Sequence, residues 1–91
     1  MRNGEEDENI VQKHFEGEGY VVLNPNEKGF PDLIVVKGRK IIFFVEVKGC
    51  KETKPFVPDS RKQIYESLKK KLGVETKCIN VNKDGNLEPY T

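Results

Sequence analysis

The sequence has few of the residues that build disulfide frameworks, zinc sites or membrane spans. Its 91 residues include two cysteines, one histidine and no tryptophan, and its longest apolar run is too short to cross a bilayer. Cys50 and Cys78 are too few for a disulfide framework or a zinc site, and we expect both to be reduced. The acidic start does not resemble a signal or transit peptide. We therefore expect a cytoplasmic protein (in the host cytoplasm if it is viral) with no membrane partner.

Several common catalytic arrangements are also missing. A single histidine, His14, disfavours a nuclease that uses a histidine-bound metal, and the sequence has no Gly-rich phosphate loop and no nucleophilic Ser or Cys constellation. We find no internal repeat, linker or low-complexity segment, so residues 1–91 form one small domain with one core. We expect no organic cofactor.

Charge is unevenly divided along the chain although the net charge is only +1. Residues 1–27 carry two basic and seven acidic side chains, whereas residues 28–91 carry fourteen basic and eight acidic ones. This asymmetry is compatible with a basic surface for a polyanion. It is equally compatible with a solvated surface of mixed charge.

The apolar pattern predicts two helices and four strands in the order αβββαβ. Ile10, Val11, His14 and Phe15 form a stripe at helical spacing, and Ser60 with Gln63 matches a capping box at the start of the second helix. A helix between the last two strands would make them parallel. We thus expect an α/β fold with a central mixed four-stranded sheet flanked by helices. The expected elements are a helix at 5–16, strands at 20–23, 32–36 and 40–47, a helix from 60 to a stop at Gly73, a strand at 74–81, then a turn and a short tail.

Two charged residues end an otherwise apolar strand. Glu46 and Lys48 are two residues apart, so they project from one face, and one interpretation is that the strand end is simply solvated. Asp32 begins the preceding strand, which folds back beside Glu46. Two carboxylates about 4 Å apart repel by roughly 4 kcal/mol at an effective dielectric near 20. Mg²⁺ relieves such repulsion, and Lys48 could act on an attacking water, which suits phosphodiester hydrolysis.

The spacing of Asp32 and Glu46 constrains the hairpin between them. Directly opposed residues of antiparallel strands share a face, so these two acids converge only if the paired residue numbers have an even sum. A two-residue turn at Gly38 and Arg39 gives an odd sum and places Asp32 opposite Val45. The sequence therefore predicts either a three-residue loop, with Gly38 in the left-handed region, or a β-bulge before Glu46.

These motifs resemble the PD-(D/E)XK nuclease signature. Pro31-Asp32 is followed after fourteen residues by Glu46-Val47-Lys48, within the flanking stretches GFPDLIVV and FFVEVKG. The chain is similar over residues 5–82 to small stand-alone VRR-NUC nucleases and, less closely, to archaeal Holliday junction resolvases. The resemblance implies a restriction-endonuclease-like core. It also implies that Asp32, Glu46 and the Val47 carbonyl bind Mg²⁺, with Mn²⁺ able to substitute, and that Lys48 acts on the water.

The resemblance implies two further catalytic residues. Glu8 stands eleven residues before Gly19, as a family glutamate does, although helical geometry makes Asp7 at least as inward-facing. Gln63 matches a family glutamine on the second helix. Both have plain alternatives, because Glu8 also fits a solvated helix start and Gln63 also completes the capping box.

We expect a Mg²⁺-dependent DNA endonuclease selective for branched, flapped or Holliday junction DNA, because so small a domain has little material for reading bases. A catalytically idle nucleic-acid-binding module, a ribonuclease and a restriction-system subunit remain alternatives. The candidate phosphate-contacting residues are Lys51, Lys54, Arg61 and Lys62. A homodimer is expected because resolving a junction needs two symmetric cuts. Phe56 and Val57 either cover the core or meet a partner.

Overall fold

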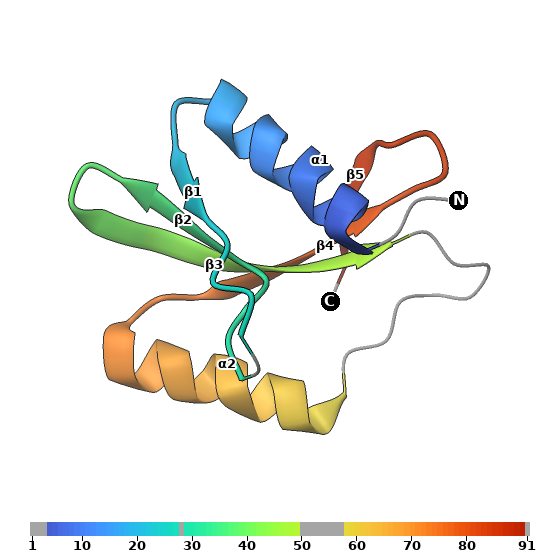
Figure 1. Cartoon of the computed structure of the whole chain (residues 1–91). Helices are drawn as coiled ribbons and strands as arrows, with labels where there is room; N and C mark the ends of the chain where they lie inside the picture. Colours follow the sequence, from blue (N-terminus) through green and yellow to red (C-terminus); the bar gives the residue numbers. More distant parts are fainter. Residues whose placement is uncertain (1–3, 28, 50–57, 91) are drawn as a thin grey trace.

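The chain folds into a sheet with one helix on each face (Figure 1). The structure is a computed structural model and describes residues 4–27, 29–49 and 58–90. The described elements are α1 (Gly4–Gly17), β1 (Val21–Leu23), β2 (Leu33–Lys37), β3 (Lys40–Gly49), α2 (Asp59–Leu72), β4 (Thr76–Val81) and β5 (Leu87–Tyr90). The strand order is β1-β2-β3-β4-β5, with β3 and β4 parallel and the other neighbours antiparallel. The predicted α/β class and the parallel pair are confirmed.

The predicted four-stranded sheet is wrong by one strand, because residues expected to form a tail form β5. The Asn82 side-chain oxygen accepts hydrogen bonds from the backbone N–H groups of Asp84 and Asn86, each at 2.9 Å, and so closes a tight turn. The returning strand includes Pro89, which lacks an N–H donor and is unusual inside a sheet. β5 lies at the edge of the sheet, where one side of the backbone needs no partner, and a proline is tolerated there.

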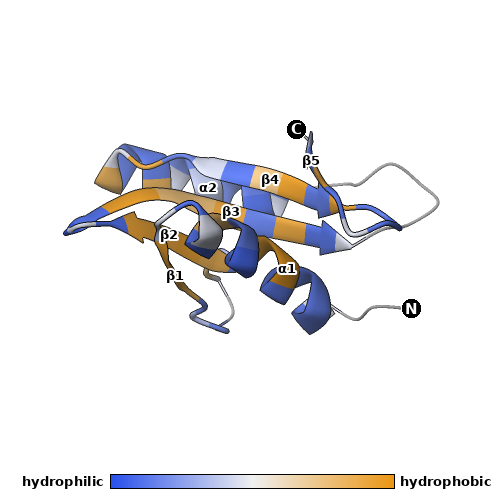
Figure 2. Cartoon of the chain, turned by 90° about the horizontal axis from the view of Figure 1, so that it is seen from above, coloured by the Kyte–Doolittle hydropathy of each residue, from blue (hydrophilic) through white to orange (hydrophobic). Residues whose placement is uncertain are grey.

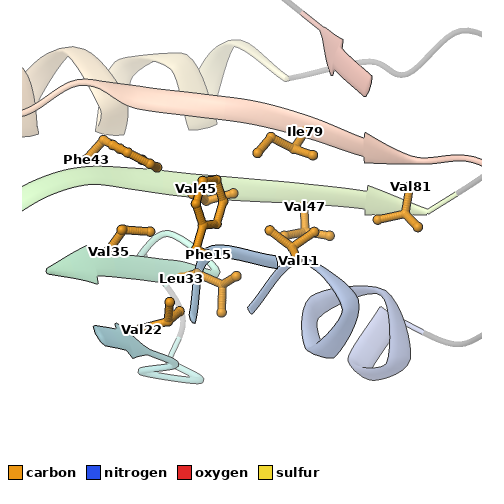
Figure 3. Close-up of a cluster of buried hydrophobic side chains, with 10 residues drawn as sticks. All are labelled: Val11, Phe15, Val22, Leu33, Val35, Phe43, Val45, Val47, Ile79 and Val81. Carbon is orange, nitrogen blue, oxygen red and sulfur yellow. The ribbon is translucent and has the colours of Figure 1, made fainter. Parts of the chain in front are cut away.

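The hydrophobic core lies between α1 and the sheet (Figure 3). Val11 and Phe15 point from α1 towards the strands, and Phe15 packs edge-to-face on Phe43 with ring centroids 5.2 Å apart. His14 of the predicted apolar stripe is instead exposed and pairs with Glu18 at 2.9 Å. The buried cluster consists of Val11, Phe15, Val22, Leu33, Val35, Phe43, Val45, Val47, Ile79 and Val81.

Backbone groups, and not side chains, cap both ends of α2. Its N-cap is Pro58, with no side-chain hydrogen bond, so the predicted capping box of Ser60 and Gln63 is wrong. Proline before the first turn suits the helix because its missing N–H would have no partner there. The predicted stop is confirmed: Gly73 has φ +69° and donates its N–H to the Lys69 carbonyl.

The sheet face that carries α2 is less completely covered. No residue of α2 is buried, whereas Val11 and Phe15 of α1 are. Val21, Val36 and Ile41 are lateral neighbours on β1, β2 and β3, and Val21 is 58% exposed. Figure 2 shows hydrophobic residues along the middle of β3 and polar residues at its end. Neither α1 nor α2, the two helices of the described residues, has the length and apolar character needed to span a membrane.

Candidate metal centre

A β-bulge brings Asp32 and Glu46 to the same face of the sheet. The turn at Gly38 and Arg39 has two residues, because Lys37 pairs with Lys40, but the register shifts between Val35 and Val36. Beyond this shift the paired numbers have an even sum, as in Leu33 with Val45, and one more step places Asp32 opposite Glu46. The bulge alternative of the hairpin prediction is therefore confirmed, and the three-residue loop is not formed. Gly38 has φ +65°, in the left-handed region, within this two-residue turn.

Asp32 contacts the backbone of β3 between the other two motif residues. Its Oδ2 accepts a hydrogen bond from the Val47 N–H at 2.8 Å. The N–H and C=O of one strand residue point to the same side, so the Val47 carbonyl is also directed towards the Asp32 side of β3. Burial raises the pKa of the Asp32 carboxyl, the Val47 hydrogen bond opposes this rise, and the nearby Glu46 adds to it. Asp32 is therefore a carboxylate whose charge would be stabilised by a cation.

Glu46 is buried and is held by two cationic side chains. Its side chain is 5% exposed; Arg61 Nη2 donates to its Oε2 at 2.8 Å, and Lys48 Nζ lies 3.9 Å from its Oε1. The same Arg61 nitrogen donates to the Phe30 carbonyl at 3.1 Å. The hydrogen bond to Glu46 is the main cause of the raised pKa of the Arg61 guanidinium. Lys48, one-third exposed, reaches both Glu46 and solvent.

The two acids at the start of α1 have different surroundings. Glu8 accepts a hydrogen bond from the Asn24 side chain at 3.3 Å, and its pKa is raised by burial and then by the charge of Asp32. Asp7 is buried against Gly49, where a Cβ would collide with its Oδ2. Both acids are thus directed inwards, as the helical geometry allowed, but it is Glu8 that lies near Asp32. Gly49 leaves the space that Asp7 occupies at the end of β3.

A cavity of about 300 Å³ opens beside these groups. It is lined by Glu8, Asn24, Asn26, Glu27, Phe30, Pro31, Asp32 and Arg61. Its charged walls are three carboxylates and one guanidinium. Glu46 is not a lining residue; the lining residue that contacts it is Arg61. The guanidinium thus contacts both the cavity and the buried carboxylate.

The other candidate residues lie elsewhere or outside the described part. Gln63 and Lys62 are exposed on α2, and it is Arg61 that α2 brings to Glu46. Lys51 and Lys54, like Cys50, lie outside the described residues. Arg61 was considered in the sequence only as a phosphate contact. Its spacing to Ile64, Tyr65 and Leu68 is the signal that could have revealed its inward position, because these residues form one helical stripe.

Tyr65 is a further residue near the acids that the sequence prediction missed. It lies one turn after Arg61 on α2, and its hydroxyl is buried. Burial, followed by the negative charge of Glu46, raises the pKa of this phenol. The hydroxyl therefore stays protonated at neutral pH and keeps a hydrogen available to an acceptor in the site.

The oxygen donors fit a hard divalent cation that keeps most of its water. Asp32, Glu46 and the Val47 carbonyl offer two carboxylates and one peptide oxygen, which is the kind of set that Mg²⁺ takes together with several waters. In residues 4–27, 29–49 and 58–90, no three His, Cys, Asp or Glu side chains are grouped to hold a metal ion by themselves. A scan against protein-family models gives no match, and a search of curated proteins gives none.

Proposed function

We propose that the protein is a Mg²⁺-dependent DNA endonuclease with a restriction-endonuclease-like core. The observation that carries the proposal is the β-bulge in the β2–β3 hairpin, which sets Asp32 opposite Glu46. Without the register shift a two-residue turn would direct Asp32 to the other face. The hydrogen bond from the Val47 N–H to Asp32 also brings the Val47 backbone, between Glu46 and Lys48, close to the Asp32 carboxylate. This is the juxtaposition expected from the resemblance to PD-(D/E)XK nucleases.

We assign these residues separate roles in phosphodiester hydrolysis. Asp32, Glu46 and the Val47 carbonyl would hold Mg²⁺, which when bound would polarise the phosphate and lower the pKa of water. Lys48 lies 3.9 Å from Glu46 with its amine open to solvent, so it can orient the attacking water or stabilise negative charge on the phosphate. Glu8 accepts from Asn24 next to Asp32 and adds negative charge near the proposed metal site. The acids would repel DNA unless a cation were bound, and this favours a nuclease over an idle binding module.

Cleavage of defined substrates tests the proposal. Linear duplex, flap, four-way junction and RNA are each incubated with Mg²⁺, Mn²⁺ or EDTA. We expect cutting of branched or flapped DNA with either metal and none with EDTA. Full activity in EDTA would contradict the metal-dependent mechanism, whereas binding of DNA with no cutting in any metal would favour the idle module. Cutting of RNA alone would retain the chemistry and change the substrate.

A homodimer remains a prediction. Phe56 and Val57, the apolar residues that suggested it, lie outside the described residues. Val21 and Ile41, 58% and 41% exposed on neighbouring parts of one sheet face, are apolar side chains that a second copy could cover. Light scattering at micromolar concentration should give about twice the chain mass of 10.4 kDa. A monomer that is unchanged by DNA would contradict paired cutting and favour a nicking or flap-trimming enzyme.

A further inference from the structure

Arg61 occupies the position of a counter-ion in the proposed metal centre. Its Nη2 is 2.8 Å from Glu46 Oε2, and its side chain is 25% exposed while that of Glu46 is 5% exposed. A buried carboxylate needs a hydrogen-bonded partner, because an unpaired charge there is costly. Lys48 is a weaker partner, since its amine is 3.9 Å from the other carboxylate oxygen. Arg61 is therefore the main neutralising group of Glu46 in the metal-free protein.

A divalent cation and Arg61 would compete for the Glu46 carboxylate. Asp32 and Arg61 both line the cavity and Arg61 is bonded to Glu46, so a cation bound between the two acids would lie beside the guanidinium. Asp32 is already on the cavity wall, where its Oδ2 accepts the hydrogen bond from the Val47 N–H. A cation that binds Asp32 together with Glu46 Oε2 therefore replaces the bond from Arg61 to that oxygen.

A phosphate group is a suitable second partner for the Arg61 guanidinium once it has left Glu46. The planar fork of arginine matches carboxylate and phosphate oxygens equally well, which a lysine ammonium does not. Arg61 is partly exposed; on the protein side it donates to the Phe30 carbonyl at 3.1 Å and lies beside the Tyr65 hydroxyl. It can therefore turn from Glu46 to a phosphate group placed over the cavity without a change in the fold of α2.

We propose that Arg61 is an exchangeable cation: it neutralises Glu46 in the metal-free protein, yields this carboxylate to the divalent cation, and then binds a phosphodiester group of the nucleic acid. The inference rests on the proposed function and deepens it. Two ligands coupled through one residue influence each other reciprocally. Removing Arg61 should therefore strengthen metal binding and weaken binding of the phosphate backbone.

The test compares Arg61→Gln with Lys70→Gln, an exposed position on the same helix. Mn²⁺ binding is measured by calorimetry without DNA, and unfolding is measured in EDTA. We expect Arg61→Gln to bind Mn²⁺ about tenfold more tightly than wild type, because a hydrogen bond to a charged group no longer opposes the metal. The same variant should be less stable in EDTA and recover stability with Mn²⁺. Lys70→Gln should match wild type in both measurements.

A second measurement uses the unchanged protein, in case Arg61→Gln does not fold. During titration with Mg²⁺, the side-chain Nε–Hε signal of Arg61 should shift along with saturation of the site, and that of the exposed Arg39 should not. An unmoved Arg61 signal at saturation, or equal or weaker Mn²⁺ binding by Arg61→Gln, would overturn the exchange and leave the nuclease proposal in place. Absence of Mn²⁺ binding in wild type and Arg61→Gln alike would instead overturn the metal centre itself.

Discussion

Asp32→Asn is expected to lower the rate of cleavage by about a thousandfold or more while the protein remains as stable as wild type or becomes more stable. The asparagine oxygen can still accept the hydrogen bond from the Val47 N–H, so the backbone contact is kept. What is lost is the negative charge, which folding disfavours because burial and Glu46 raise the pKa of Asp32. The substitution should therefore separate catalysis from folding.

The raised pKa of Asp32 predicts how the stability of the protein changes with pH. A carboxyl whose pKa is raised on folding holds its proton more tightly in the folded protein than in the unfolded chain. Wild-type stability in EDTA should therefore fall as pH rises from the ordinary Asp value through the raised one. Thermal unfolding from about pH 4 to about pH 8 should show a smaller fall in Asp32→Asn.

Controls make the result specific. Glu66→Gln removes the charge of an exposed acid on α2 and should leave both the cleavage rate and the unfolding curves unchanged. Glu46→Ala and Lys48→Ala should also abolish cleavage. If Asp32→Asn cut DNA at the wild-type rate, Asp32 could not be a metal ligand. If it unfolded at a clearly lower temperature, the carboxylate would be a stabilising group and the electrostatic argument would fail.

Leu33→Ala is expected to cost about 2–5 kcal/mol of the free energy of unfolding. Leu33 is completely buried between α1 and the sheet, and truncation leaves a cavity that a close-packed core cannot fill. A domain of this kind has only about 5–15 kcal/mol in total. Urea denaturation measures the loss. Cleavage should fall in parallel, because the pair of Leu33 with Val45 is the one next to Asp32 and helps to position it.

The same substitution at another leucine is the matched control. Leu72, at the end of α2, is 55% exposed, and Leu72→Ala should change the free energy of unfolding by about 0.5 kcal/mol or less. A small effect of Leu33→Ala, similar to that of Leu72→Ala, would show that the region around Leu33 is not the tightly packed core described above.

The sequence was most informative where one physical rule excluded alternatives. The number of residues between Asp32 and Glu46, together with the turn signal at Gly38, required an irregularity in the hairpin if the two acids were to meet. The apolar runs at 33–36 and 41–45 identified β2 and β3, and the helix between β3 and β4 required these two strands to be parallel. These predictions depend on local spacing and on chain connectivity, and both are visible in one sequence.

Other features depended on tertiary contacts that spacing does not determine. β5 was missed because Pro89 argues against a strand unless it is known to lie at the edge of the sheet. The capping box was wrong because Pro58 already starts α2. Arg61 was not assigned to Glu46, since the angle at which α2 crosses the sheet decides which of its polar residues reaches a buried acid.

The position of the bulge divides the hairpin into two parts with different freedom to change. The pairs from Val35 with Phe43 to Leu33 with Val45 set the place of Asp32, and they lie wholly on the far side of the bulge from the turn. Residues 36–41 therefore form a tip whose length is independent of that register. In evolutionary terms, the tip is where this small domain can gain or lose residues, or acquire a substrate-reading extension, while the two acids continue to face each other.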